Sequence, residues 1–176
     1  MEQPYPQDWE DDVVLLHGGR VHMRPIRADD EERLREFHAK LSPESVYFRY
    51  FAPYPVLREK DVRRFTHVDY VDRVALVATI DDEIVGVGRY DRLGDPTSAE
   101  VAFIVRDDMQ HRGIGSALLG HLAAAARDRG VHRFVAEVLA SNNKMRSMFE
   151  DSGYAPKASF EDGYILMQFD IDVPPA

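Results

Sequence analysis

The stretch MQHRGIGSALLGHLAAAARDRG, residues 109–130, joins a glycine-containing turn to the longest helical pattern in the chain. An apolar stripe runs along one face of that pattern through Ile114, Leu118, His121, Leu122 and Ala125, and Gly130 supplies a helix stop. Gly113 and Gly115 stand at its start, where free backbone N–H groups and the helix dipole favour an anion. A tight strand-to-helix turn would also need glycines, so the neighbouring residues must decide between a purely structural turn and an anion-binding one.

Two nucleotide-binding loops fit this turn poorly. A P-loop ends in Gly-Lys-Ser/Thr, whereas residues 115–117 read Gly-Ser-Ala and lack the lysine. The dinucleotide fingerprint needs a third glycine where this chain has Leu118, although Glu137 lies at a suitable distance downstream. Dinucleotide binding stays as a minor alternative.

The pattern on both sides of the turn predicts one mixed domain. Residues 13–24 read as a hairpin around a Gly-Gly pair, residues 30–41 and 43–51 as two helices, and residues 58–68 as a further helical turn or two. Three strands in a meander (73–80, 83–93, 99–105) precede the turn, and a strand (132–140), a short helix (142–153) and a closing strand pair (154–171) follow it. We therefore predict an α/β (α+β) fold, with a mostly antiparallel central sheet of about seven strands and helices on both faces.

Composition sets the limits of function. The 176 residues are 44% hydrophobic, enough for one core, and we expect a domain over 13–171 between a polar tail (1–12) and a Pro-rich tail or linker (172–176). The net charge of −9 argues against nucleic-acid binding, and no apolar stretch is long enough for a membrane span. There is no cysteine, and the seven histidines show no ligand spacing, so we expect a cytoplasmic protein without a metal.

Three segments together resemble the GNAT (Gcn5-related) N-acetyltransferases. QHRGIG resembles that family's Q/R-x-x-G-x-G/A loop, the preceding AEVAFIV resembles its fourth strand, and ASNNKMRSMFEDSGY resembles its N-x-x-A-x-x-L-Y-x-x-x-G-F element. The similarity covers residues 21 to about 169 in the family's element order. LSPESVYFRYFAPYP and RVALVATIDDEIVGVGRYDR further resemble the GNAT domains of bacterial Pat-type protein-lysine acetyltransferases, which modify acyl-CoA synthetases and are often fused to a larger region.

The resemblance implies acetyl transfer from acetyl-CoA to an amine. Its pyrophosphate would lie on the backbone of residues 111–116, with added charge from Arg112, and its pantetheine between strand 103–105 and the strand RFVAEV. The Ile104 amide would polarise the thioester carbonyl. The implied cofactor-binding residues are Phe103, Ile104, Val105, Gln110, His111, Arg112, Gly113, Ile114, Gly115, Ser116, Asn142 and Phe149.

Glu100 is the implied general base, because an attacking lysine must lose its proton before it can act as a nucleophile. Strand alternation alone would allow a plain solvent-facing glutamate at that position. Phe149 stands where relatives often carry a tyrosine that protonates the leaving thiolate, so Tyr154 or water would replace it, or no acid is needed. Because there is no cysteine to carry an acyl group, we expect direct transfer in a ternary complex.

The expected partner is a protein with an exposed lysine, such as an acyl-CoA synthetase. Aromatic residues of the second helix region could hold a lysine stem, and nearby carboxylates could attract a basic segment (Tyr47, Phe48, Tyr50, Phe51 and Tyr54; Asp107, Asp108, Glu161 and Asp162). Acetylation of a small amine, and a non-catalytic acetyl-CoA sensor, remain as alternatives.

Overall fold

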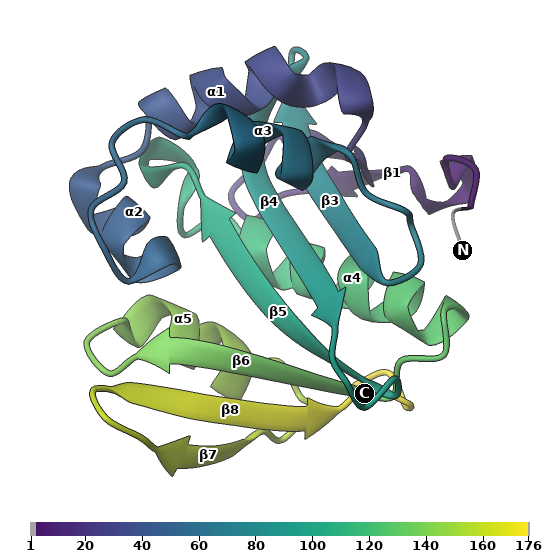
Figure 1. Cartoon of the computed structure of the whole chain (residues 1–176), viewed down its shortest axis with the longest axis vertical. Coiled ribbons are helices and arrows are strands. Elements are labelled where there is room, and N and C mark those ends of the chain that lie inside the picture. Colours follow the sequence, from purple (N-terminus) through teal and green to yellow (C-terminus); the bar gives the residue numbers. More distant parts are fainter. Residues whose placement is uncertain (1–2, 176) are drawn as a thin grey trace.

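The computed structural model describes residues 3–175, which form an eight-stranded sheet in the order β1-β2-β3-β4-β5-β6-β8-β7 (Figure 1). Neighbouring strands are antiparallel except β5 and β6, which run parallel. The strands are β1 (Asp11–Val14), β2 (Arg20–Pro25), β3 (Arg73–Ile80), β4 (Glu83–Arg92), β5 (Ser98–Val105), β6 (Arg133–Leu139), β7 (Lys157–Phe160) and β8 (Tyr164–Asp170). The predicted mixed fold is confirmed. The sheet has one strand more than expected because both arms of the first hairpin join it.

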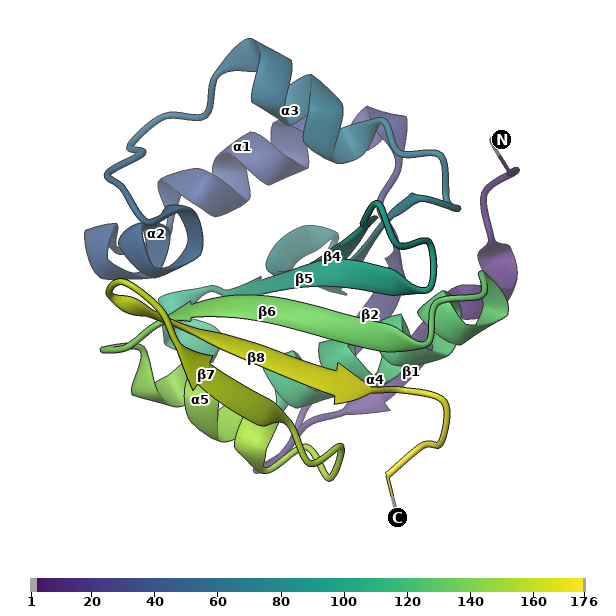
Figure 2. The same ribbon diagram turned by 60° about the horizontal axis from the view of Figure 1, so that its bottom comes forward.

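Five α-helices cover the two faces of the sheet. α1 (Glu31–Ala39), α2 (Pro43–Tyr50) and α3 (Glu59–Thr66) lie on one side, and α4 (Ile114–Asp128) and α5 (Asn143–Glu150) on the other (Figure 2). Three short 3-10 helices complete the order, η1 (Gln7–Trp9), η2 (Ala28–Asp30) and η3 (Asp107–Met109). Each face has its own buried apolar cluster, so the molecule has three layers.

Local sequence signals explain most element boundaries. Ser42 caps α2, with its hydroxyl oxygen accepting a hydrogen bond from the Ser45 N–H, and Pro43 opens the helix. The β1–β2 connection passes through His17, Gly18 and Gly19, all with positive φ, as a tight hairpin requires.

The N-terminal segment is packed where a polar tail was expected. η1 forms within residues 3–12, Trp9 packs against the larger core cluster, and its indole N–H donates to Asp128 at 3.1 Å. β1 begins at Asp11 and pairs with β2 there. The large apolar surface of Trp9 accounts for this docking. Residues 1, 2 and 176 of the two expected tails lie outside the described residues.

The parallel contact between β5 and β6 is short. It joins only Ser98 to Arg133, Ala99 to Phe134 and Glu100 to Val135. Beyond Glu100 the two strands diverge, while β5 continues to pair with β4 up to Val105. Within residues 3–175, one edge of β5 therefore has no strand partner over its second half. No helix in the described chain is long and apolar enough to cross a membrane.

Candidate functional site

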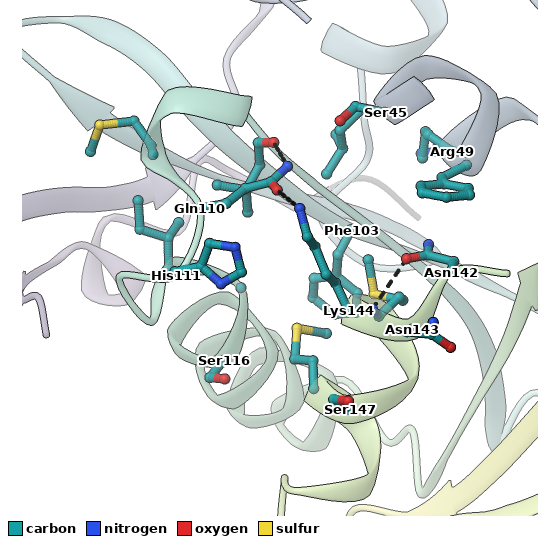
Figure 3. Close-up of a pocket in the computed structure, with 18 of the residues that line it drawn as sticks. Ser45, Arg49, Phe103, Gln110, His111, Ser116, Asn142, Asn143, Lys144 and Ser147 are labelled. Carbon is teal, nitrogen blue, oxygen red and sulfur yellow. Dashed lines mark hydrogen bonds between the residues drawn. The ribbon is translucent and has the colours of Figure 1, made fainter. Parts of the chain in front are cut away.

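A cleft of about 490 Å³ opens where β5 and β6 diverge. Its walls come from the second half of β5, the loop before α4, the first turn of α4, the start of α5 and one side of α2 (Figure 3). Of the twelve residues expected to bind the cofactor, ten line this cleft: Phe103, Ile104, Val105, Gln110, His111, Gly113, Ile114, Gly115, Ser116 and Asn142.

The turn before α4 presents backbone donors to the cleft. Gly113 has φ +85°, a left-handed conformation that glycine adopts without strain, and its carbonyl accepts the first helical hydrogen bond, from the Ala117 N–H at 3.0 Å. The N–H groups of Ile114, Gly115 and Ser116 therefore lack the carbonyl acceptor that a preceding turn would supply. They stand at the positive end of a 15-residue helix, an arrangement suited to a phosphate.

Gly115 serves a different purpose from Gly113. A Cβ atom on Gly115 would lie 2.8 Å from the Met148 sulfur of α5, closer than atoms normally approach. The missing side chain thus allows α5 to approach the start of α4, and these two helices form one wall of the cleft.

Lys144 of α5 lines the cleft and contacts the loop that precedes α4. The Lys144 ammonium donates to the Gln110 side-chain oxygen at 2.9 Å, and the Gln110 amide nitrogen donates to the Val105 carbonyl at 3.1 Å (Figure 3). This chain of bonds links the end of β5 to the start of α5 across the loop that precedes α4. Sequence reasoning missed Lys144, which no motif marks.

Arg112, expected to add charge at the turn, does not line the cleft. Its carbonyl accepts a hydrogen bond from the Leu16 N–H at 3.0 Å, which ties the loop to the first hairpin. His111 and Gly113 on either side both have positive φ, so the backbone reverses around Arg112.

Phe149 also lies outside the lining, contrary to its expected place. It is 1% exposed and packs edge-on against Phe103, with ring centroids 5.8 Å apart, so it supports the cleft wall from behind. Tyr154, the suggested replacement acid, stacks on Phe169 at 5.4 Å and does not reach the cleft either.

Asn142 does line the cleft, and it also caps α5. Its side-chain oxygen accepts a hydrogen bond from the Met145 N–H at 3.2 Å. The cap sets the direction of the first turn of α5, which carries Lys144.

Glu100 lies at the point where β5 and β6 separate, on the sheet face opposite Phe103. Glu100 is an exposed residue of β5 and pairs with Val135 of β6. No helix of the described chain covers β6, β8 and β7 on one side of the sheet (Figure 1). Partial burial of the carboxyl group, followed by the charges of Glu137 and Asp91, raises its pKa. A carboxylate with a raised pKa beside an open face is suited to accept a proton.

Several other expected acceptor-side groups make contacts within the protein. Asp107 binds the hydroxyl groups of Ser42 and Ser45 at 2.7 and 2.9 Å, and Asp108 pairs with Arg106 at 2.6 Å. From α2, Phe48 lines the cleft, while Tyr50 packs against His38, Tyr54 and Phe65. α2 also contributes Glu44, Ser45 and Arg49 to the lining, residues that sequence reasoning did not select.

The three-layer fold contains two strands that diverge, a helix N-terminus suited to a phosphate, and a carboxylate with a raised pKa. Together these features indicate the acyltransferase class of enzymes. Residues 32–154 match the model of the Acetyltransferase (GNAT) family, which is well over half of the chain. The chain belongs to that family, and both the GNAT resemblance and the Pat-type resemblance are confirmed.

Three relatives show the relationship in more detail. The crystal structure of the GNAT domain of S. lividans PAT is 55% identical, with a TM-score of 0.91, covering 94% of this chain and 99% of that one. Acetyltransferase Pat of Mycolicibacterium smegmatis is 36% identical over 166 residues, 93% of this chain and 49% of that protein. An acetyltransferase of Pseudomonas aeruginosa is 30% identical over 155 residues, 85% of this chain and 83% of that protein. The chain thus spans about half the length of the mycolicibacterial relative.

Proposed function

We propose that this chain transfers the acetyl group of acetyl-CoA directly to a lysine side chain of a protein, such as an acyl-CoA synthetase. The observation that carries the proposal is the cleft, which joins the unpaired edge of β5 to the free N–H groups at the start of α4. Acetyl-CoA carries a thioester joined to a diphosphate through a peptide-like arm. The arm matches the unpaired edge of β5, and the diphosphate matches the free N–H groups of α4.

The residues present fit such a donor. The backbone of residues 113–116 and Lys144 would hold the diphosphate, and the free edge of β5 at Phe103 to Val105 would pair with the amides of the pantetheine arm. In the β4–β5 ladder the Ile104 N–H is directed at the Val87 carbonyl, so the expectation that it polarises the thioester carbonyl is wrong. The Val105 N–H, on the free edge, would take that role.

The chemistry is a single displacement. The neutral amine nitrogen attacks the thioester carbon, the carbon–sulfur bond breaks, and CoA leaves as a thiolate. The amine proton passes to the Glu100 carboxylate, directly or through water. A chain without cysteine has no thiol to carry the acetyl group between two half-reactions.

The similarity to Pat-type domains supports a protein acceptor over a small amine. Residence in the cytoplasm, where acetyl-CoA and acyl-CoA synthetases occur together, belongs to this proposal, as does fusion to further domains in a longer protein.

The test begins with calorimetric titration of acetyl-CoA. The complex is then incubated with acyl-CoA synthetases, lysine peptides and small amines, and products are mapped by mass spectrometry. We expect acetyl-lysine on a synthetase. Acetylation of small amines alone would assign the alternative substrate class, and binding without transfer to any acceptor would indicate a sensor.

Two variants test the site. Glu100→Gln should preserve acetyl-CoA affinity and lower turnover by about 10²-fold or more. Gly113→Glu should abolish binding, because it adds a negative charge beside the turn and replaces a glycine whose φ of +85° other residues rarely adopt. Gly120→Glu is the control for the added charge, since Gly120 is an exposed residue of α4 with open space around it. Equal loss of binding in the two glycine variants would contradict the assignment.

A further inference from the structure

Arg89 is a buried arginine without a carboxylate partner. It lies on β4, is 7% exposed, and forms no ion pair with any residue of the described chain. Its guanidinium carbon lies 4.5 Å from the centre of the Phe65 ring, and its one hydrogen bond within residues 3–175 is a long one of 3.5 Å to the Phe65 carbonyl. Most of its five N–H donors, and its charge, therefore lack a strong acceptor among these residues.

Two carboxylates on the same sheet face lie near Arg89 in the strand register, and neither forms an ion pair with it. Asp91, two residues further along β4, pairs with Arg73 at 3.2 Å. Glu100 is a diagonal neighbour of Arg89, which lies opposite Ala102. Diagonal neighbours are about 7–8 Å apart, and Glu100 is exposed to solvent, which screens its charge. Neither carboxylate gives the buried guanidinium a direct counter-charge.

Arg89 lines a small cavity of about 20 Å³ between the sheet and the helices α1, α2 and α3, which cover this face (Figure 2). The lining includes a second arginine, Arg49 of α2, which lies over the Tyr50 ring at 4.7 Å and also forms no ion pair within the described chain. The other walls are His38 and apolar or aromatic side chains, so no carboxylate of the described residues lines the cavity. Two arginines thus share one small space without an acidic group.

Two cations beside one cavity destabilise each other unless an anion lies between them. Desolvation, followed by the charge of Arg49, lowers the pKa of Arg89 to about 9. An anion in the cavity would offset both effects, because it attracts the guanidinium groups and accepts hydrogen bonds from their free N–H groups. An apolar side chain of similar volume would fill the position of Arg89 without the cost of a buried charge, so packing alone does not account for an arginine here.

The volume of the cavity limits the kind of anion. About 20 Å³ is enough for one water-sized particle, since a single water needs about 10–15 Å³. A phosphate or an organic carboxylate is too large for this space, whereas a chloride ion is only slightly larger than a water molecule. Arg49 and Ile104 line both this cavity and the cleft, so the two spaces adjoin there.

We propose that Arg89 and Arg49 form a binding site for one chloride ion in the cavity beneath α1, α2 and α3. The ion accepts hydrogen bonds from guanidinium groups of β4 and α2 and so links the helical layer to the sheet. Its binding stabilises the folded chain. The inference does not rest on the proposed function, because Arg89 does not line the cleft and no acyl group takes part.

Bromide locates the site directly, because it replaces chloride and scatters X-rays anomalously. Crystals of the wild-type chain grown without chloride and soaked in sodium bromide should show an anomalous peak in the cavity, within hydrogen-bond distance of the Arg89 guanidinium. A cavity that holds water only, with no anomalous peak, would overturn the proposal. This measurement needs no variant.

Stability in solution is the second measurement. Urea unfolding is compared in sodium chloride and in sodium gluconate at equal ionic strength, because gluconate is too large for the cavity and screens exposed charges to the same extent. The Kd for chloride comes from the broadening of the ³⁵Cl resonance as the protein is added. At a chloride concentration of about ten times this Kd, the ratio of folded to unfolded protein should be about 11-fold higher than in gluconate.

Three variants assign the effect to the cavity. Arg89→Met and Arg49→Met each remove one of its cations, and Arg64→Met is the control, since Arg64 is an exposed arginine of α3 that does not line the cavity. The chloride dependence and the ³⁵Cl broadening should be lost in Arg89→Met, weakened in Arg49→Met and unchanged in Arg64→Met. Equal chloride dependence in all four proteins would indicate a general salt effect and overturn the proposal. Equal wild-type stability in chloride and gluconate would also overturn it.

Discussion

Replacement of Lys144 by methionine should weaken acetyl-CoA binding through the diphosphate alone. Met preserves most of the side-chain volume and removes the charge. In the structure the ammonium already donates one hydrogen bond, to Gln110 at 2.9 Å, so a bound diphosphate would compete with that bond.

The expected magnitude is the difference between two hydrogen bonds. A bond between the ammonium and a phosphate oxygen contributes about 1.5–3 kcal/mol, and the bond to the neutral Gln110 oxygen that it replaces contributes about 1 kcal/mol. The net loss of about 0.5–2 kcal/mol corresponds to a Kd that is about 2- to 30-fold higher.

Calorimetry with two ligands measures this effect. The Kd for acetyl-CoA should rise in Lys144→Met. The affinity of this variant for acetyl-CoA should also fall less steeply with added salt than that of wild type. The Kd for S-acetyl-pantetheine, which lacks the diphosphate, should not change. Arg112→Met is the matched control, because Arg112 is an exposed cation next to the same turn that does not line the cleft.

Two results would refute the reasoning. One is an equal loss of acetyl-CoA affinity in Lys144→Met and Arg112→Met, which would indicate that any positive charge near the loop favours binding equally. The other is an equal loss for both ligands in Lys144→Met, which would indicate a disturbed cleft.

Three further predictions concern pH dependence and stability. Glu137→Gln removes a charge that raises the pKa of Glu100, so the acidic limb of the kcat/KM profile should move to lower pH. A limb that stays in place would show that the charge of Glu137 does not influence the group that titrates. Gly115→Ala should lower the free energy of unfolding in urea by about 1–3 kcal/mol, because its Cβ would lie 2.8 Å from the Met148 sulfur. Gly120→Ala, with open space around it, should raise that free energy by about 0.5–1 kcal/mol. The reverse order of stability would contradict the packing argument. Asp30→Asn should cost about 3–5 kcal/mol, since it leaves a buried guanidinium unpaired. Burial raises the pKa of Asp30, but hydrogen bonds from Arg24 and from the Arg27 N–H lower it overall. The stability that the Asp30–Arg24 pair contributes is therefore present above the ordinary carboxyl pKa and is lost as pH falls through the folded-state value. A free energy of unfolding that does not fall on acidification would count against this contribution.

Most of the fold could be predicted because its signals are local. Period-2 runs bounded by Asp and Gly turns mark the strands, and Ser42-Pro43 and Gly130 mark helix ends, so the sequence contained each element in order. The packing of residues 3–12 was missed because their composition is polar, and the contacts that hold them, through Tyr5, Trp9 and Glu10, join residues far apart in the sequence.

The cleft could be predicted only in part, for a physical reason. A backbone motif such as Gly113-x-Gly115 is continuous in sequence, whereas the charge beside it comes from another helix. Which side of α5 faces the cleft depends on its rotation about its own axis, and the structure turns Met148 toward the cleft and Phe149 into the core. Phe149, expected at the cofactor because of its place in the motif, therefore lies in the core, and Met148, expected in the core, lines the cleft.

The divergence of β5 from β6 also explains how one strand could serve two substrates. Side chains on β5 alternate, so Phe103 faces the α4 and α5 layer and Glu100 faces the open side of the sheet. In a continuous sheet, a donor bound on one face and a base on the other would be separated by backbone hydrogen bonds. Here pairing with β6 stops at Glu100, and the next residues of β5 have a free edge. A thioester paired along that edge and an amine arriving from the open face would meet in the gap, which is the geometry that direct transfer requires.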